Sequence, residues 1–205
     1  MKPDQIEKES FRIILDELGP HSFSSSELAI VQRVIHATAD FDYKNLLHIS
    51  AKAIENGIQA IRSGCNFYCD VQMIAAGVSQ ALMTSYGCGI DCKVSDPQVV
   101  SIASQQQKTR SEVAMQQFGP KLNDSIVTIG NAPTALFEVL RLFESEQIKP
   151  ALVIGVPVGF VNAAESKQAL TLAGLDFITT TGRKGGSTVA VAIVNALLRL
   201  AGGTL

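Results

Sequence analysis

The feature that most constrains the fold is an alternation, from residue 65 onward, between short apolar runs and longer helical stretches. Short β-branched runs predict buried strands, and a helix between successive strands makes those strands parallel. The sequence therefore predicts an α/β fold, a flavodoxin-like three-layer domain with a five-stranded parallel sheet. The expected strands are 66–69, 89–94, 125–129, 151–156 and 177–180, and the expected helices are 71–85, 97–118, 132–146, 163–172 and 187–201.

A helical segment is expected before these repeats. Residues 4–18 place their apolar side chains on one helical face, serines before Glu27 can cap a second helix, and residues 50–64 fit a third. A chain of 205 residues can bury a core without disulfides or metals. We expect a single domain, with a helical N-terminal segment at 1–64 and the βα repeats at 65–205.

Charge and hydropathy exclude several classes of partner. The net charge is −2, from 17 basic and 19 acidic residues, so no overall field attracts nucleic acid or an anionic membrane. No run approaches the roughly 18 apolar residues of a membrane span. The first residues, MKPDQIEKESFRII, are acidic and amphipathic, unlike a signal peptide. We expect a cytoplasmic protein without nucleic-acid or membrane partners, in which any anion site is local.

The cysteines form two pairs, Cys65 with Cys69 and Cys88 with Cys92, each with three residues between its members. Such spacing occurs in structural zinc sites, which usually lie in polar turns. Here GCNFYCD alternates like a strand, with Cys65, Phe67 and Cys69 on one face. The pattern favours buried free thiols in a reducing compartment over a metal or redox role, so we expect no protein-bound metal.

The loop TTGRKGGST combines two glycines and two cations at the start of an apolar helix. In an open parallel sheet the ligand crevice lies beyond the carboxyl ends of the strands, where this loop is expected, and a helix start suits an anion. A Walker A motif needs its lysine after the glycines, so a nucleotide is not favoured. Alternatively, Gly185 and Gly186 only make a tight turn, which leaves Arg183 and Lys184 solvated.

Several polar residues elsewhere are candidates for the same crevice. His36 ends a helix in RVIHATAD, and a histidine can act as an acid or base near neutral pH, although a lone helical histidine is more often packed or capping. Arg110 either faces the crevice or makes a surface salt bridge. Asn131 and Thr134 either donate hydrogen bonds into it or cap the next helix. Lys167 is interpreted as a solvated residue of a helix face.

Taken together, these segments resemble the precorrin-8X methylmutase family, also called cobalt-precorrin-8 methylmutase, of corrinoid (cobalamin) biosynthesis. The resemblance covers nearly the whole chain, without the cysteine pairs. It rests on IEKESFRII, RVIHATAD, DVQMIAAGV, TRSEVAM, IGNAPTAL, PALVIGVPVGFVNAAESK and GRKGGSTVAVAIVNAL. It implies an isomerase that moves a methyl group from carbon 11 to carbon 12 of a tetrapyrrole. The product is hydrogenobyrinate, or cobyrinate when the ring holds cobalt.

The resemblance also implies a role for His36, the histidine of RVIHATAD, as the proposed acid. Protonation makes the conjugated ring electron-poor and eases a formal [1,5]-sigmatropic shift. The methyl group stays within the molecule, so no cofactor is expected. The implied assembly is a homo-oligomer, with a dimer favoured and with sites near the subunit interface.

A flat macrocycle fringed with carboxylates calls for cations and amides around its rim and for apolar side chains against its face. The residues expected at the rim are Arg110, Arg183, Lys184, Gly185, Gly186, Ser187, Asn131 and Thr134, and those expected at the face are Val158, Phe160 and Met73.

Two further readings belong to other classes of protein. A corrinoid carrier would bind the same ligand without transforming it and would need no proton donor. A flavodoxin-like response or nucleotide module would need a phosphate loop or an acidic phosphoacceptor cluster, and the sequence has neither. Both the cobalt-free and the cobalt-containing substrate agree with the sequence.

Overall fold

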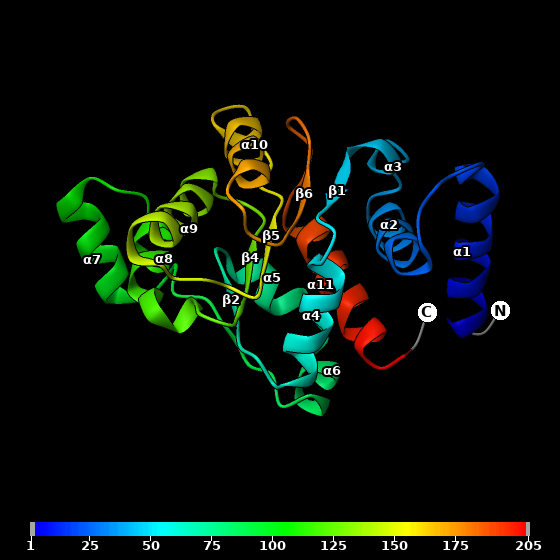
Figure 1. The fold of residues 1–205 in the computed structure, drawn as a ribbon, viewed down its shortest axis with the longest axis horizontal. Coiled ribbons are helices and arrows are strands. Elements are labelled where there is room, and N and C mark those ends of the chain that lie inside the picture. Colours follow the sequence, from blue (N-terminus) through cyan, green and yellow to red (C-terminus); the bar gives the residue numbers. More distant parts are fainter. Residues whose placement is uncertain (1–2, 204–205) are drawn as a thin grey trace.

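A computed structural model describes residues 3–203, and a six-stranded sheet lies at its centre with helices on both faces (Figure 1). Five strands run parallel and the edge strand β1 is antiparallel to its neighbour β6. The predicted α/β class and parallel core are confirmed, whereas the predicted number of five strands is wrong. Across the sheet the order is β1 (Leu47–Ile49), β6 (Phe177–Thr180), β5 (Leu152–Gly155), β4 (Ile126–Ile129), β2 (Phe67–Cys69) and β3 (Ile90–Asp91).

The unexpected strand is β1, which lies within the segment 1–64 that was predicted to be helical. His48 of β1 is opposite Thr179 of β6, and the amide of Ser50 donates to the carbonyl of Phe177 at 3.0 Å. A three-residue edge strand is too short to show a period of two in its sequence. Its position depends on β6, more than a hundred residues later, so local patterning could not predict it.

One face of the sheet is covered by four helices that share a hydrophobic core with it. They are α2 (Ser25–Thr38), α4 (Ala53–Arg62), α5 (Gln72–Gly77) and α11 (Ser187–Ala201). Helix α1 (Pro3–Leu18) packs on the outer side of α2, at the edge of the molecule (Figure 1). The predicted serine cap of α2 is confirmed, because Ser24 and Glu27 form a reciprocal capping box.

Helix α11 is the most buried helix of this face. Its side chains from Val189 to Ala201 include ten that are almost inaccessible to solvent. A Cβ atom added to Gly77 of α5 would lie 2.8 Å from a methyl of Val191, so glycine permits the close approach of α5 and α11. Within residues 3–203, no helix is both long enough and apolar enough to cross a membrane.

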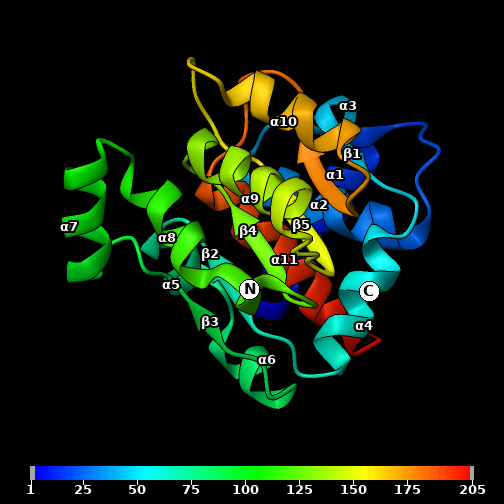
Figure 2. The ribbon, with the colours of Figure 1, turned by 60° about the vertical axis from the view of Figure 1, so that its left-hand side comes forward.

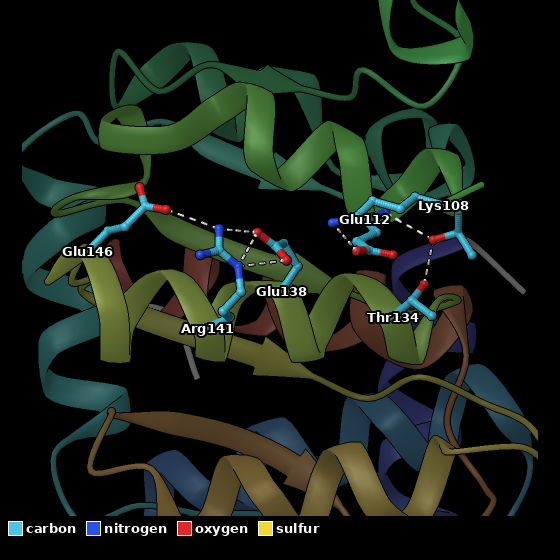
Figure 3. Close-up of polar contacts among 7 residues, drawn as sticks. Lys108, Glu112, Thr134, Glu138, Arg141 and Glu146 are labelled. Atoms are coloured by element: carbon cyan, nitrogen blue, oxygen red, sulfur yellow. Dashed lines mark hydrogen bonds and ion pairs between the residues drawn. The ribbon is translucent and has the colours of Figure 1, made fainter. Parts of the chain in front are cut away.

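The other face carries α8 (Arg110–Phe118), α9 (Pro133–Glu146) and α10 (Ala163–Leu172) over a second core cluster, and α7 (Pro97–Gln106) packs outside α8 (Figure 2). Polar side chains lie along the boundary between α8 and α9 (Figure 3). Lys108 pairs with Glu112 at 2.8 Å, and the buried Glu138 accepts hydrogen bonds from Arg141 at 2.6 to 3.1 Å. Each pair joins residues of one segment, three or four positions apart, so it supports its own helix.

Two expected helices are interrupted. Residues 71–85 form α5 and α6 (Gln80–Ser85) because Ser79 caps a new helix, and residues 97–118 form α7 and α8 because Thr109 does the same. Val78 continues the apolar pattern through the first break, so periodicity predicts one helix there. Residues 104–112 are all polar, so the sequence already contained a signal for the second break. The short elements α3 (Tyr43–Leu46) and η1 (Gly119–Leu122) complete the fold.

Candidate functional site

The loops that follow β4, β5 and β6 meet at one edge of the sheet. A Cβ atom added to Gly130, after β4, would lie 2.9 Å from the Cα of Ser187 at the start of α11. A Cβ atom on Gly185 would overlap the carbonyl oxygen of Val156, and the amide of Gly186 donates to that same oxygen at 2.8 Å. Only glycine fits at position 185, so the loop after β6 is packed tightly beneath the end of β5.

A cavity of about 310 Å³ lies between α2, α5 and α11. It brings together three of the predicted site residues, His36, Met73 and Ser187, from three segments that are far apart in the sequence. The lining residues are Arg33, His36, Ala37, Met73, Gly77, Ser187, Thr188, Val191, Ala192 and Asn195. The mixture of one imidazole, one guanidinium and several apolar side chains suits a ligand with a flat apolar body and polar groups at its edge.

His36 stands in the last turn of α2, and its side chain is exposed to solvent. Its ring lies 5.1 Å from that of Phe11 in α1, at an interplanar angle of 36°. The guanidinium of Arg33 lies 5.1 Å from the same phenyl ring and pairs with Glu7 at 3.2 Å. Helix α1 therefore orients both residues, and the imidazole remains accessible to exchange a proton with a ligand.

A second cavity, of about 490 Å³, lies between the ends of β2 and β4 and the start of α8. It brings together Arg110, Asn131 and Thr134. The hydroxyl of Thr134 forms a hydrogen bond of 2.7 Å with that of Thr109, which caps α8 (Figure 3). The other lining residues are Asp70, Val71, Val94, Ser111, Ala132 and Pro133.

The buried carboxylate of Asp70 shapes the loop after β4. It accepts the backbone amides of Gly130 at 3.0 Å, Asn131 at 2.9 Å and Ala132 at 2.6 Å. Burial raises the pKa of Asp70, and the three amides oppose that rise because they stabilise the carboxylate. The sequence analysis did not select Asp70 as a site residue, although a carboxylate directly after a buried strand was a signal for it.

The loops after β5 and β6 carry the predicted apolar face and one predicted cation. Phe160 is 83% exposed and Val158 is 47% exposed, a large apolar surface, although neither side chain lines either of the two cavities. The guanidinium of Arg183 lies 5.2 Å from the centre of the Phe160 ring, and its carbonyl accepts the amide of Gly159 at 3.2 Å. The two loops thus present an aromatic ring and a cation together.

Lys184 is engaged within the protein. Its Nζ pairs with Asp40 at 2.6 Å and with Asp42 at 2.7 Å, just after the helix that carries His36. These hydrogen bonds raise the pKa of Lys184 above its ordinary value and lower that of Asp40. The predicted contact of Lys184 with a substrate carboxylate stays a prediction, and such a carboxylate would compete with two others.

The interpretation of Lys167 as a solvated residue is wrong. It is only 1% exposed, and its Nζ donates to the hydroxyl of Thr180 at 3.1 Å and to the carbonyl of Lys184 at 2.7 Å. A signal existed, because Lys167 lies on the stripe of α10 that also holds the buried Ala163, Ser166 and Leu170.

The cysteines lie on β2 and β3 and their continuations, and Cys69, at the end of β2, directly precedes Asp70. Cys69 is buried, and the other three are half-buried. Burial raises the pKa of Cys65 to about 12. Among residues 3–203, no group of three or more His, Cys, Asp or Glu side chains is arranged to hold a metal ion.

The sequence of the chain matches known proteins over nearly its whole length. The family model for precorrin-8X methylmutase matches residues 5–200. The cobalt-precorrin-8 methylmutase of Leptospira interrogans is 50% identical over 203 residues, which cover 95% of this chain and 92% of that protein. The cobalt-precorrin-8 methylmutase of Priestia megaterium is 46% identical over 201 residues, which cover 98% of this chain and 89% of that protein.

The fold agrees with the sequence comparison. The crystal structure of precorrin-8x methyl mutase from Thermus thermophilus superposes with a TM-score of 0.90 at 43% identity, over 97% of this chain and 98% of that one. Sequence and structure therefore lead to the same conclusion, that this chain belongs to the precorrin-8X methylmutase family.

Proposed function

We propose that His36 is the acid with which this methylmutase of cobalamin biosynthesis moves a methyl group from carbon 11 to carbon 12 of precorrin-8X or cobalt-precorrin-8. The observation that carries the proposal is the cavity in which the exposed imidazole meets Met73 and Ser187. The products are hydrogenobyrinate and cobyrinate, respectively.

The chemistry needs one proton and no electrons. A protonated His36 gives its proton to the conjugated ring system, the cationic ring draws the methyl group to carbon 12, and the proton then returns to the imidazole. Substrate and product are isomers, so the residue ends the cycle in the state in which it began. A methyl group that stays within the molecule requires no methyl donor and no redox partner.

Substrate carboxylates are bound in this proposal by Arg110 and Arg183. Both side chains are exposed, and neither pairs with a carboxylate in the part of the chain that the structure describes. Arginine holds a carboxylate through two parallel hydrogen bonds, which suits the acetate and propionate groups of the rim. Asn131, Thr134 and the backbone amides of Gly185 and Ser187 add neutral donors, whereas Gly186 gives its amide to Val156 and shapes the loop before α11. Met73, Val158 and Phe160 lie against the ring.

We further infer a flavodoxin-like arrangement from the strand order. Counted among themselves, the five parallel strands lie in the order 2-1-3-4-5, which is the order of that fold. Ligands of such folds bind where the direction of strand order reverses, here between β2 and β4. Asp70 and the loop after β4, which line the second cavity, are at this position.

A homodimer is part of the proposal. Ile6 and Ile13 of α1 are 52% and 43% exposed and, being seven residues apart, lie on the same side of the helix, which leaves an apolar surface for a second copy. Because Phe11 of α1 contacts His36, a dimer formed through α1 would place each site near the interface. Sedimentation of the chain and of its Ile6→Glu, Ile13→Glu variant would show a dimer that dissociates on substitution, and an equal mass for both would reject this arrangement.

The test of the acid is ultraviolet-visible absorption with precorrin-8X, and separately with its cobalt form, after mixing with the wild type, His36→Ala and His48→Ala. His48 is exposed on β1 and lines neither cavity, so it is the matched control. Methyl migration interrupts conjugation at carbon 12 and relieves it at carbon 11, so the spectrum shifts. We expect conversion by the wild type and the control, and binding without conversion by His36→Ala.

Two results would reject parts of this proposal. Conversion by His36→Ala at the wild-type rate would remove His36 from the mechanism. Binding without conversion by the wild type would favour a corrinoid carrier instead.

A further inference from the structure

Lys167 of α10 is a buried cation whose position neither the fold nor the proposed chemistry requires. Lys167 is 1% exposed, and its side chain is among the largest that are fully buried in the described part of the protein. Its Nζ contacts the Thr180 hydroxyl at 3.1 Å and the Lys184 carbonyl at 2.7 Å. Within residues 3–203 no carboxylate pairs with it.

Burial of an ammonium group without a carboxylate opposes folding, because water no longer solvates the charge. The same burial lowers the pKa of Lys167 to about 8. A methionine of similar length would fill the same space without a charge. The lysine therefore has a function that an apolar side chain cannot supply, which is hydrogen-bond donation to the loop after β6.

The contacted carbonyl stands at the centre of that loop. The oxygen of Lys184 accepts both the ammonium of Lys167 and the hydroxyl of Thr180, the latter at 2.8 Å. The next two residues are Gly185 and Gly186, and a φ of 120° at Gly186 is a conformation that favours glycine. An inward-facing carbonyl at position 184 thus fixes the backbone just before the start of α11.

The consequences reach the site from both sides of that carbonyl. On one side the guanidinium of Arg183 lies over the ring of Phe160, and on the other Ser187 begins α11 and lines the same cavity as His36. The side chain of Lys184 continues to Asp40 and Asp42, after the helix that ends near His36. A change in the orientation of the peptide between Lys184 and Gly185 would therefore move Arg183, the side chain of Lys184 and Ser187 together.

We propose that Lys167 is a positioning residue: its ammonium group holds the Lys184 carbonyl inward and thereby sets the conformation of loop 181–186, from which Arg183 reaches the substrate. The inference rests on the proposed binding of substrate by this loop. It predicts that loss of the ammonium loosens the loop and weakens substrate binding while the chemical step is largely kept.

The test compares Lys167→Met with Gln168→Met, a matched variant at the next position, whose side chain is exposed on α10. The first measurement is trypsin cleavage after Arg183 and Lys184 in the substrate-free protein, which reports the loop directly. For Lys167→Met we expect cleavage about 10-fold faster than in the wild type, because local opening exposes the bonds. Gln168→Met is expected to match the wild type.

The second measurement is the kinetics of the methyl shift. We expect Lys167→Met to raise KM about 10-fold with a change in kcat below about 3-fold, since the interaction removed serves binding. If Lys167→Met fails to fold, Thr180→Val tests the same carbonyl by removing its second donor, with smaller changes in the same direction.

Cleavage of Lys167→Met at the wild-type rate would overturn the inference, as would unchanged cleavage of Thr180→Val where that variant takes its place. Faster cleavage with an unchanged KM would also overturn it, because the loop would then be held by Lys167 without contributing to substrate binding. The inference is independent of the acid: a raised KM in Lys167→Met supports it even if His36→Ala proves active.

Discussion

The loops after β4 and β6 are held by buried charges of opposite sign. Asp70 accepts three backbone amides of the first loop, whereas Lys167 donates to one carbonyl of the second. The carboxylate turns these amides inward, away from the proposed ligand, so the proposed function leaves the side chains of Asn131 and Thr134 as the donors of that loop. A single inward carbonyl leaves the neighbouring groups of the second loop available.

The difference shows how a rigid loop, after β4, and a more adaptable loop, after β6, can lie at the same edge of the sheet. Three charge-assisted hydrogen bonds to one carboxylate fix three successive residues. One ammonium bond and one hydroxyl bond fix a single peptide, and the loop around it relies on glycines for its shape. We therefore expect the loop after β4 to be the more stable of the two.

Replacement of the carboxylate is expected to have the largest effect. Asp70→Ala leaves three backbone amides without an acceptor near the bottom of the second cavity, and buried unpaired donors are strongly unfavourable. We expect the free energy of unfolding in urea to fall by about 3–5 kcal/mol. Asp91→Ala, at an exposed position of β3, is the control and should change it by less than about 0.5 kcal/mol.

A loss of less than about 1 kcal/mol in Asp70→Ala would mean that water or a neighbouring group replaces the carboxylate. The two loops would then be held with similar strength, and the contrast between them would not stand.

The charge of Lys167 makes its loop sensitive to pH in a defined window. The pKa of Lys167 in the folded protein is about 8, below the ordinary 10.5. Between these values the unfolded chain binds a proton that the folded protein does not, so the free energy of unfolding rises with pH. Below pH 8 both states are protonated, and the cost of burying the charge is present in full.

We expect the difference in unfolding free energy between the wild type and Lys167→Met to shift in favour of the wild type by about 1–3 kcal/mol from pH 7.5 to 10.5. Urea titrations of both proteins at several pH values measure it, and the contributions of the other titrating groups cancel in the difference. A difference that is constant with pH would show that the ammonium is solvated rather than buried.

The sequence predicted the βα repeats well because their signals are local. Helices α10 and α11 and strand β6 begin and end where apolar periodicity and flanking glycines placed them. The rule that ligands bind beyond the carboxyl ends of parallel strands placed Asn131 and Ser187 at the same edge of the sheet. The cavities that these residues line follow from that topology.

What the sequence did not predict depends on distant contacts. The partners of Lys184, Asp40 and Asp42, lie more than 140 residues earlier in the chain, so nothing near the GRKGG motif reveals that this cation is already paired. The edge strand β1 exists only because β6 is beside it. The buried Lys167 had a local signal, but a charged residue on an apolar stripe was given its commonest interpretation, that of a solvated side chain.

The smallest expected effect comes from the contact between Thr134 and Thr109, and it tests whether this contact or Asp70 holds the loop after β4. Thr134→Val removes the hydroxyl that bonds to Thr109 at 2.7 Å and keeps the shape of the side chain, whereas Thr134→Ser keeps the hydroxyl. Thr109 is exposed and still caps α8 by accepting the amide of Glu112, so water can replace the lost partner. We expect Thr134→Val to lower the free energy of unfolding by about 0.5–1 kcal/mol.

Amide hydrogen exchange of Gly130, Asn131 and Ala132 decides what this loss means. If Asp70 holds the loop, exchange at these amides stays slow in Thr134→Val, and a rise in KM for the substrate, absent in Thr134→Ser, reports a lost hydrogen bond to the ligand. If exchange accelerates instead, the hydroxyl pair shares in holding the loop. The carboxylate would then be only one of two supports, and the rigidity of the loop after β4 would come from its contact with α8 as much as from the buried charge.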